Sequence, residues 1–337
     1  MKKNEDPIDF VITWVDGSDP AWRAEKADYM PDKGTDAREE RYRDWNLLRY
    51  WFRGVEKFAP WVRKIHFVTW GHLPSWLDTN NPKLHIVRHD TFIPKEFLPV
   101  FNSNVIEFYL HKIEGLAENF VYFNDDMFLL RPIQPKVFFR RGKPCDMLAF
   151  QPVVANPMDP VMSHLYLNNA LVLTKHFRKR DNVKKQVRNY FKLGYPPLYF
   201  CYNILEMAFP LYTGFYTIHG AMPFCKQTFL EIWEKEEEVL TEASKHRFRH
   251  KDDVTIYLFR EWQKLSGNFY AKNAQRGFRY FNVDNYNLKL LRTIRKQKAK
   301  MICMNDANYF IDFDRVKGEI EQAFSDILPE VSSFEHV

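Results

Sequence analysis

The sequence predicts an α/β protein in which a central, mostly parallel sheet is flanked by helices. Three observations lead to this class. Short runs of β-branched and aromatic residues alternate with amphipathic segments, in the order strand, helix, strand, strand, helix, strand. The chain has 337 residues, 45% of them hydrophobic, which is enough for a large core. No repeat or linker interrupts it, so residues 1–337 are expected to form a single domain.

The first half of the chain supplies most of the expected sheet. Residues 8–15 are rich in β-branched side chains and end in the turn sequence 16–20. The stretch 21–44 is highly charged with few aliphatic residues, which indicates a surface loop or a mobile lid. Apolar residues at helical spacing and an Ala-Pro stop predict a helix over 47–58. We further expect strands over 65–70, 84–87 and 120–123, and a helix over 104–116.

The second half is expected to be more helical. Residues 175–192 contain eight Lys or Arg and one Asp between apolar residues, which predicts a basic amphipathic helix within a helical insertion near 155–215. Residues 289–300 carry six Lys or Arg and no acid. Further helices are expected over 229–243, 251–265 and 316–328, with strand-like runs at 216–218 and 301–304.

Charge and cysteine content narrow the possible partners and the compartment. The net charge of +6 favours anionic partners such as nucleotides, phosphorylated sugars or lipid headgroups, but is too small to indicate nucleic acid. The cysteines lack zinc-site spacing and are read as reduced thiols of a cytoplasmic protein: Cys145, Cys201, Cys225 and Cys303. No leader or membrane span is found, so any membrane contact is expected to be peripheral.

The most informative motif is Asn124-Asp125-Asp126, which follows the apolar run 120–123. Two adjacent carboxylates at a strand end repel each other unless a divalent metal or a basic cluster lies between them. Ligands of open α/β sheets bind outside the carboxyl ends of the strands. The motif therefore favours a metal-assisted site for a phosphate-bearing ligand, although an Asn-Asp turn explains it equally well. Neighbouring residues of an extended chain point in opposite directions, so only one of the two aspartates is expected to reach the metal.

Three other polar residues follow strand-like runs in the same way. Asp16 follows 8–15, where it could face a pyrophosphate or form an Asx-turn with Gly17. Asp306 follows 301–304 and repeats the Asn-Asp pattern, again with a turn as the alternative. His219 follows 216–218 and titrates near neutral pH, which suits a general base, although a lone His is more often structural.

Several ordered blocks of the chain resemble the Stealth family of sugar-1-phosphate transferases. This family includes bacterial capsular and exopolysaccharide phosphotransferases and the animal lysosomal-enzyme N-acetylglucosamine-1-phosphotransferase. The similar blocks are residues 9–17, the stretch from Arg43-Asp44 to Asn124-Asp125-Asp126, His219 to Phe224 with Lys226, Arg247-Phe248-Arg249 with Asp252-Asp253, and the tail segments 302–306 and 329–335. Leu47 replaces a usual acidic residue and Gly54 a common Ser, and neither change affects the carboxylates.

The resemblance implies a Rossmann-like or GT-A-like sheet and a reaction at phosphorus. A hydroxyl of an acceptor glycan attacks the β-phosphorus of a nucleotide sugar such as a UDP-sugar, and UMP leaves. The implied catalytic residues are Asp16, His219 and Arg249, and the implied ligands for Mg²⁺ or Mn²⁺ are Asp125, Asp126 and Asp306. The implied substrate-binding residues are Arg43, Arg49, Asn102, Ser103, Glu107, Arg247, Asp253 and Asn305.

Two alternative functions remain open at this stage. One is a metal-dependent GT-A glycosyltransferase that releases UDP, and the other is a carbohydrate-binding protein without catalysis. The acceptor is a cell-surface polysaccharide that could be lipid-linked. The basic segments 175–192 and 289–300 then have two interpretations, as surfaces resting on the anionic inner membrane leaflet or as solvated helix faces.

Overall fold

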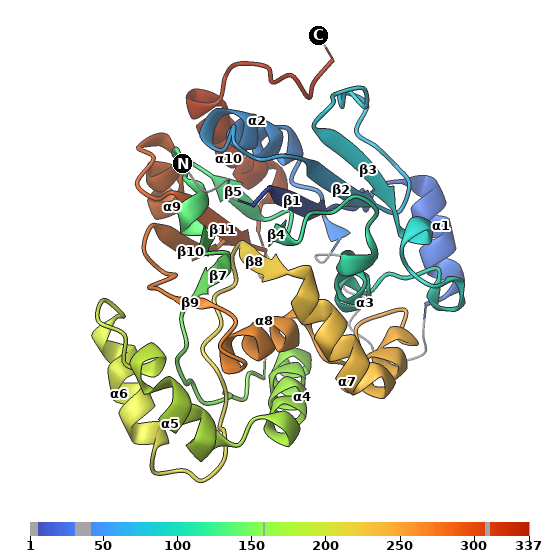
Figure 1. The fold of residues 1–337 in the computed structure, drawn as a ribbon. Helices are drawn as coiled ribbons and strands as arrows, with labels where there is room; N and C mark the ends of the chain where they lie inside the picture. The colour runs from blue at the N-terminus through green and yellow to red at the C-terminus, as the bar shows by residue number, and fades with distance from the viewer. Residues whose placement is uncertain (1–5, 31–41, 158, 307–310, 337) are drawn as a thin grey trace.

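A five-stranded sheet forms the centre of the computed structural model, which describes residues 6–30, 42–157, 159–306 and 311–336 (Figure 1). Its strand order is β3-β2-β1-β4-β8. The bounds are β1 Ile8–Thr13, β2 Ile65–Thr69, β3 Leu84–Arg88, β4 Asn119–Phe123 and β8 Met222–Cys225. The first four strands are parallel and β8 is antiparallel. The α/β class is therefore confirmed, and the sheet is mixed, with β8 as its one antiparallel strand.

Both faces of this sheet are covered, which explains why its strands are almost continuously apolar. Alternate residues of β1 enter two different cores. Phe10 and Ile12 pack with α2 (Leu48–Phe58) and α10 (Phe313–Ile327). Val11 packs with the second core, to which α3 (Ser103–Phe108), α7 (Lys226–Ser244) and α8 (Ile256–Leu265) contribute. Figure 1 shows α2 and α10 on one side of the sheet and α7 and α8 on the other.

Two small sheets extend the central one. The first has the order β10-β11-β5, with β10 Phe278–Asn282, β11 Met301–Asn305 and β5 Met127–Leu129. The second has the order β6-β7-β9, with β6 Phe139–Arg140, β7 Lys143–Asp146 and β9 Tyr270–Ala271. Helix α9 (Leu288–Arg295) packs beside α10. Short 3₁₀ turns lie at His89–Thr91, Lys95–Phe97, Leu110–Lys112 and Pro135–Val137.

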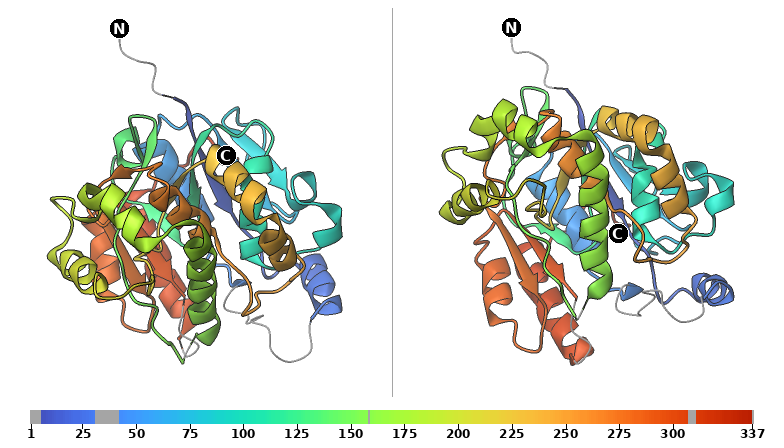
Figure 2. Two further views of the ribbon diagram at one scale, coloured as in Figure 1. Left: turned by 60° about the horizontal axis from the view of Figure 1, so that its bottom comes forward. Right: turned by 90° about the horizontal axis from the view of Figure 1, so that it is seen from below.

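Three helices occupy the region expected to hold a helical insertion. They are α4 Pro160–His176, α5 Lys179–Tyr190 and α6 Pro197–Glu206, and they lie at the periphery of the molecule (Figure 2). The prediction of one basic helix over 175–192 is wrong in one respect. Helix α4 ends at His176, and Phe177, in an extended conformation, separates it from α5. Within the described ranges, no helix combines the length and the apolar character needed to cross a bilayer.

The structure corrects the expected loop in the charged stretch 21–44. Helix α1 (Pro20–Asp28) lies there, with Asp19 as its N-cap and Pro20 in its first turn. It is stabilised by the burial of Trp22, a tertiary effect that the high charge of the segment obscures. The part of the expected lid over 31–41 lies outside the described residues.

Three further elements differ from the expectation. The helix expected over 104–116 ends at Phe108, and a 3₁₀ turn follows. The helix expected from 251 begins at Ile256, because the side chain of Thr255 accepts a hydrogen bond from the Tyr257 amide and caps it. Residues 216–218 form no strand, and only the neighbouring Phe215 makes an isolated bridge, to Phe150.

A buried ion pair attaches the C-terminal segment to α2. Arg53 donates from Nε and Nη2 to the two carboxylate oxygens of Glu335, at 2.7 and 2.8 Å. The side chains are only 9% and 4% exposed. Burial alone would raise the pKa of Glu335, but the hydrogen bonds from Arg53 and Ser332 outweigh it and lower the pKa below its ordinary value.

Glu335→Ala is expected to lower the free energy of unfolding by about 3 to 5 kcal/mol, because it leaves the Arg53 guanidinium buried without its counter-charge. Chemical denaturation measures this change. The matched control is Glu319→Ala, which breaks a solvent-exposed ion pair with Arg315 and is expected to leave the free energy of unfolding almost unchanged. Equal losses in the two variants would contradict the assignment.

Candidate active site

The two neighbours of β4 bring three chain segments to one edge of the sheet. Strand β1 is the parallel neighbour, and its Ile12 pairs with Phe123 of β4. The residues that follow β1 and β4 therefore leave the sheet side by side. Strand β8 is the antiparallel neighbour, and its first residue, Met222, pairs with Tyr122 of β4. The residues before β8 therefore lie beyond the carboxyl end of β4. Asp16, the motif 124–126 and His219 therefore meet at the carboxyl ends of the parallel strands, where α/β proteins bind ligands.

The small sheet brings in a fourth segment. After the motif 124–126 the chain continues directly into β5, which pairs antiparallel with β11. Cys303 lies opposite Met127, and the Met304 amide donates to the carbonyl of Asp126 at 2.9 Å. Cys303 is thereby placed beside the Asp126 side chain.

Asp126, His219 and Cys303 form the centre of the site. Asp126 Oδ2 lies 3.3 Å from His219 Nε2 and accepts a hydrogen bond from Cys303 Sγ at 3.1 Å. Burial and the neighbouring carboxylate raise the pKa of Cys303 well above its ordinary value, so the thiol keeps its proton for this bond. The other oxygen of Asp126 is buried and has no hydrogen-bond partner among the described residues.

The imidazole of His219 is held from both ends. Its Nδ1 lies 2.6 Å from the hydroxyl of Tyr257, a residue of α8, and its Nε2 faces Asp126. Burial lowers the pKa of His219, but the negative charge of Asp126 outweighs it and the net shift is upward. This arrangement orients the ring and tunes it to accept a proton.

A carboxylic acid and an arginine lie next to His219. Glu107 of α3 is buried and accepts a hydrogen bond from the Tyr122 hydroxyl at 2.9 Å. Burial raises the pKa of Glu107 to about 7, although Tyr122 and the positive charges of Arg249 and His219 oppose the shift. Arg249 donates from Nη2 to the hydroxyl of Ser103 at 3.0 Å, which directs its guanidinium toward this group.

Three further carboxylates, those of Asp16, Asp44 and Asp125, lie at the solvent side of the cluster, which we call the mouth of the site. Asp16 accepts hydrogen bonds from the amide and hydroxyl of Ser18, at 2.9 and 2.6 Å, so it does form the turn considered as its alternative role. Burial and the charge of Asp16 raise the pKa of Asp44. Asp125 is exposed at the surface, but the protein atoms around its carboxylate reduce its solvation. This loss of solvation and the negative charges of Asp126 and Asp44 raise the pKa of Asp125 to about 7.

Gly17 allows two segments of this mouth to approach closely. A Cβ atom at Gly17 would lie 1.9 Å from the carbonyl oxygen of Tyr42. No real Cβ contact is this short, and the atom it meets belongs to the backbone and cannot rotate away. The absence of a side chain therefore keeps Asp16 and Asp44 on facing segments.

Asn102 and Asp253 form a buried hydrogen-bond network next to the segment that carries Arg249. Asn102 caps α3 and donates to Asp253 Oδ2 at 2.8 Å, while His246 Nδ1 lies 2.6 Å from Asp253 Oδ1. The Asp253 carboxylate is fully buried and also accepts from the His250 amide at 2.9 Å. This network fixes the segment that carries Arg249, and the helix cap considered for Asp253 is formed by Thr255 instead.

The remaining residues implied by the resemblance contact other partners. Arg43 lies 3.6 Å from Asp306 and over the Phe313 ring. The side-chain amide of Asn305 donates to Asn282 Oδ1 at 3.1 Å. Two arginines lie over aromatic rings, Arg49 over Trp76 and Arg247 over Tyr29.

The cluster suits a divalent cation in part. Four carboxylates, those of Asp16, Asp44, Asp125 and Asp126, lie in one region, and a cation would relieve their repulsion. The buried, unpartnered oxygen of Asp126 is a suitable hard ligand, and Mg²⁺ needs few protein ligands when substrate phosphates supply others. Among the described residues, the donor atoms of three side chains lie within 4.8 Å of one another: Asp126, His219 and Cys303. Neither Asp125 nor Asp306 belongs to this group.

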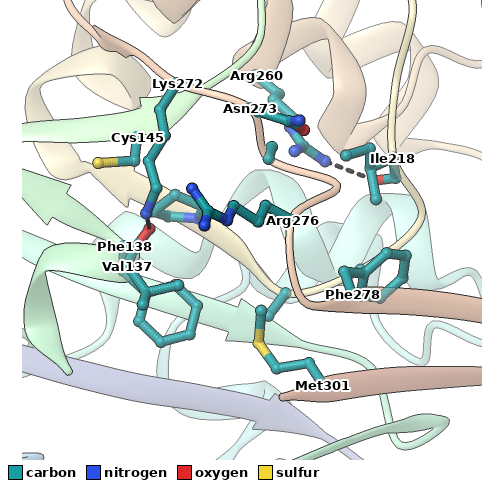
Figure 3. A pocket seen from close by; sticks show the side chains of 14 residues that line it. Val137, Phe138, Cys145, Ile218, Arg260, Lys272, Asn273, Arg276, Phe278 and Met301 are labelled. Atoms are coloured by element: carbon teal, nitrogen blue, oxygen red, sulfur yellow. Dashed lines mark hydrogen bonds between the residues drawn. The ribbon is translucent and has the colours of Figure 1, made fainter. Parts of the chain in front are cut away.

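Two hollows flank the site. The cavity in Figure 3 lies behind the His219 segment, with Ile218, Arg260, Lys272 and Arg276 on its wall, and its volume of about 40 Å³ suits only water. A larger cleft of about 560 Å³ is lined by Asp19, Glu25, Trp70, Gly71, His72, Arg88, His89, Asp90, Leu98, Pro99 and Val100. His72 accepts a hydrogen bond from the Asp16 amide at 2.8 Å, so this cleft adjoins the carboxylates.

Comparisons with known proteins identify the family. Models of Stealth conserved regions 1 and 2 match residues 6–34 and 41–146. The capsular polysaccharide phosphotransferase WcwK of Streptococcus pneumoniae is 39% identical over 336 residues, 99% of each chain. The chain belongs to the Stealth family. Stealth relatives with similar coverage include the receptor polysaccharide phosphotransferase WefC of Streptococcus gordonii, 38% identical over 97% of this chain and 98% of WefC. The exopolysaccharide phosphotransferase cps2G of Lactiplantibacillus plantarum is 35% identical over 97% and 96%.

The sequence-based selection missed three residues of this Stealth site. Tyr257 lies in an ordinary amphipathic helix, while Asp44 and Cys303 fall within blocks that resemble the family but have no role assigned to them from the sequence. Cys303 had one available signal, since it lies three residues before Asp306 in a tail that resembles the family.

Gly17→Ala is expected to reduce turnover by about 100-fold, since the clash with Tyr42 shifts Asp16 or Asp44 by roughly an ångström. Turnover is measured as transfer of a sugar phosphate to a polysaccharide acceptor. Gly318→Ala, on the open face of α10 with nothing within 4 Å of the added Cβ, is the matched control and should keep full activity. Wild-type turnover in a folded Gly17→Ala protein would remove this close approach from the site.

Proposed function

We propose that this protein transfers a sugar-1-phosphate from a nucleotide sugar to a hydroxyl of a growing cell-surface polysaccharide. One observation carries the proposal: an oriented imidazole, His219, lies beside a cation, Arg249, within a group of carboxylates at the carboxyl edge of the sheet. Phosphoryl transfer requires a base for the attacking hydroxyl and positive charge for the phosphate oxygens. The names of the Stealth relatives, which are polysaccharide phosphotransferases, support the same reaction class.

In the proposed reaction the acceptor oxygen forms a bond to the β-phosphorus of the donor. The bond between that phosphorus and the bridging oxygen breaks, and UMP leaves with this oxygen when the donor is a UDP-sugar. His219 Nε2 takes the hydroxyl proton, while Tyr257 holds the ring at Nδ1. Arg249, fixed by Ser103, binds the phosphate oxygens.

We assign the nucleoside end of the donor to the cleft beside His72. Its volume of about 560 Å³ falls within the range of small-molecule sites. The Trp70 ring offers a flat surface, and the hydrogen bond from the Asp16 amide to His72 connects the cleft to the carboxylates. A donor lying along this GT-A-like edge would place its pyrophosphate between Asp16 and the Asn124–Asp126 motif.

We further propose that Mg²⁺ or Mn²⁺ assists, held through Asp126 with Asp125 at the mouth. When bound, such an ion would neutralise charge on the phosphate oxygens. Both metals prefer oxygen ligands, so the Cys303 thiol is expected to serve Asp126 as a hydrogen-bond donor. We place the reaction on the cytoplasmic side.

Identification of the nucleotide product tests the reaction. Purified protein is incubated with UDP-sugars, Mg²⁺ or Mn²⁺ and an acceptor glycan, with a chelated sample alongside. We expect UMP and a phosphodiester-linked product, and loss of both when the metal is removed. UDP would instead indicate glycosyl transfer, in which the acceptor oxygen attacks the anomeric carbon of the donor sugar. No turnover with any UDP-sugar would indicate a binding protein or a different donor.

His219→Ala is expected to lower kcat by about 10² to 10⁴, the usual contribution of a general base. A base must be unprotonated, so wild-type kcat/KM, which reports the free enzyme, should fall as the pH drops through the pKa of His219, which the Asp126 carboxylate raises above its ordinary value. The variant should lose this acid limb. His336→Ala, in the exposed C-terminal segment, is the matched control and should keep both rate and profile. An unchanged acid limb in His219→Ala would assign the base elsewhere.

A further inference from the structure

Helix α6 has an inverted distribution of polar and apolar side chains. Its buried face carries Tyr199, Asn203 and Glu206. Its solvent face carries Leu198, Cys201, Ile204 and Leu205, which recur at helical spacing, with Ile204 62% and Leu205 64% exposed. A surface helix of a soluble protein normally turns its apolar stripe inward, so this stripe lacks the partner for which it is suited.

The apolar surface continues beyond the end of α6. We use the term apolar ridge for the exposed apolar side chains of this region: Leu193, Leu198, Ile204, Leu205, Met207, Phe209 and Leu211. Seven large apolar side chains are exposed within these 19 residues, a density unlike that of the single exposed leucines found on any surface. Concentrations of this kind mark sites of protein or membrane interaction.

The apolar ridge is held in place from within. Lys179 of α5 is buried, and its ammonium donates to the Glu206 carboxylate at 3.1 Å. The same nitrogen also donates to the backbone carbonyls of Glu206, Phe209 and Leu211, at 2.7, 3.1 and 2.8 Å. Because one buried cation fixes the chain from 206 to 211, the outward apolar side chains belong to an ordered surface.

The helix beside the apolar ridge presents positive charge to solvent. Exposed cations lie on and around α5, with Asp181 as the one exposed acid among residues 178–192: Arg178, Arg180, Lys184, Lys185, Arg188 and Lys192. The Lys179–Glu206 ion pair shows that α5 and α6 are neighbours, and Figures 1 and 2 show both at the outer end of the helical region.

The other basic segment, 289–300, lacks this combination. Helix α9 buries Leu290, Leu291 and Ile294 against the core, so most of its apolar stripe is already covered. Tyr286 and Leu288 are exposed just before the basic segment, but the large apolar side chains within 289–300 are all buried. Its cations therefore form a solvated face. The solvated-face interpretation therefore applies to 289–300, and the membrane-surface interpretation remains for 175–192.

We propose that the apolar ridge and the cationic face of α5 together bind an anionic membrane surface. Shallow insertion of apolar side chains combined with attraction to acidic headgroups is how peripheral helices bind lipid. A second copy of this chain fits less well, because a two-fold interface would bring the same cationic faces together. The proposal does not depend on the reaction, but it would place the enzyme where lipid-linked acceptors are found.

Vesicle cosedimentation tests the proposal with the full chain. Phosphatidylglycerol-containing vesicles should bind the protein at low salt, and pure phosphatidylcholine vesicles should bind it more weakly. Ile204→Asp with Leu205→Asp should reduce partitioning by at least about tenfold, because two apolar anchors are lost. Replacing Lys184, Lys185 and Arg188 by Gln should reduce binding to acidic vesicles by about fivefold per charge.

Matched controls separate this effect from general changes in surface. Leu230→Asp alters an exposed leucine of α7, and Arg292→Gln with Lys296→Gln alters the α9 face; both should leave binding unchanged. Thermal unfolding and turnover of a water-soluble acceptor check that the ridge variants are intact. No vesicle binding at low salt would overturn the proposal. A concentration-dependent dimer that the ridge variants convert to monomer, without vesicle binding, would assign the ridge to a second copy instead.

Discussion

Strand β4 has a parallel neighbour on one side and an antiparallel neighbour on the other, and the active site depends on this pairing. The parallel register with β1 aligns the ends of two strands, so that Asp16 and Asp125 emerge at one edge. The antiparallel register with β8 reverses the direction of approach, so that His219 reaches the same edge from the opposite side. A wholly parallel sheet would place the residues before β8 at the far edge, away from the carboxylates.

The sequence predicted the four parallel strands, because β1, β2 and β4 are short β-branched or aromatic runs buried on both faces. It did not predict the antiparallel strand β8. It failed where tertiary contacts decide the structure. Helix α1 is highly charged and is held by the burial of one tryptophan, Trp22. The two-residue strands β6 and β9 carry too few residues for any periodicity to appear. The length of α3 was overestimated because apolar spacing continues past its end at Phe108.

For the site, residue type and position at a strand end selected Asp126, and the resemblance to the family selected His219 and Arg249 as well; the structure brings the three together. They were not sufficient to show which groups share a contact. Cys303 reaches Asp126 only through the antiparallel pairing of β5 with β11, a long-range feature without a local signal. Tyr257 lies in a helix that is almost wholly buried, so nothing in its spacing separates it from core residues.

The stretch 119–129 forms two consecutive strands that belong to different sheets, and each pairs with a segment contributing a reactive group. A single inserted or deleted residue in this stretch would change the register of one pairing relative to the other, and would turn alternate side chains to the wrong face. Length variation among natural homologues should therefore be absent here and should accumulate in surface connections away from the site. The number of residues between Tyr122, which pairs with Met222, and Met127, which pairs with Cys303, is therefore fixed by the need to keep both pairings in register.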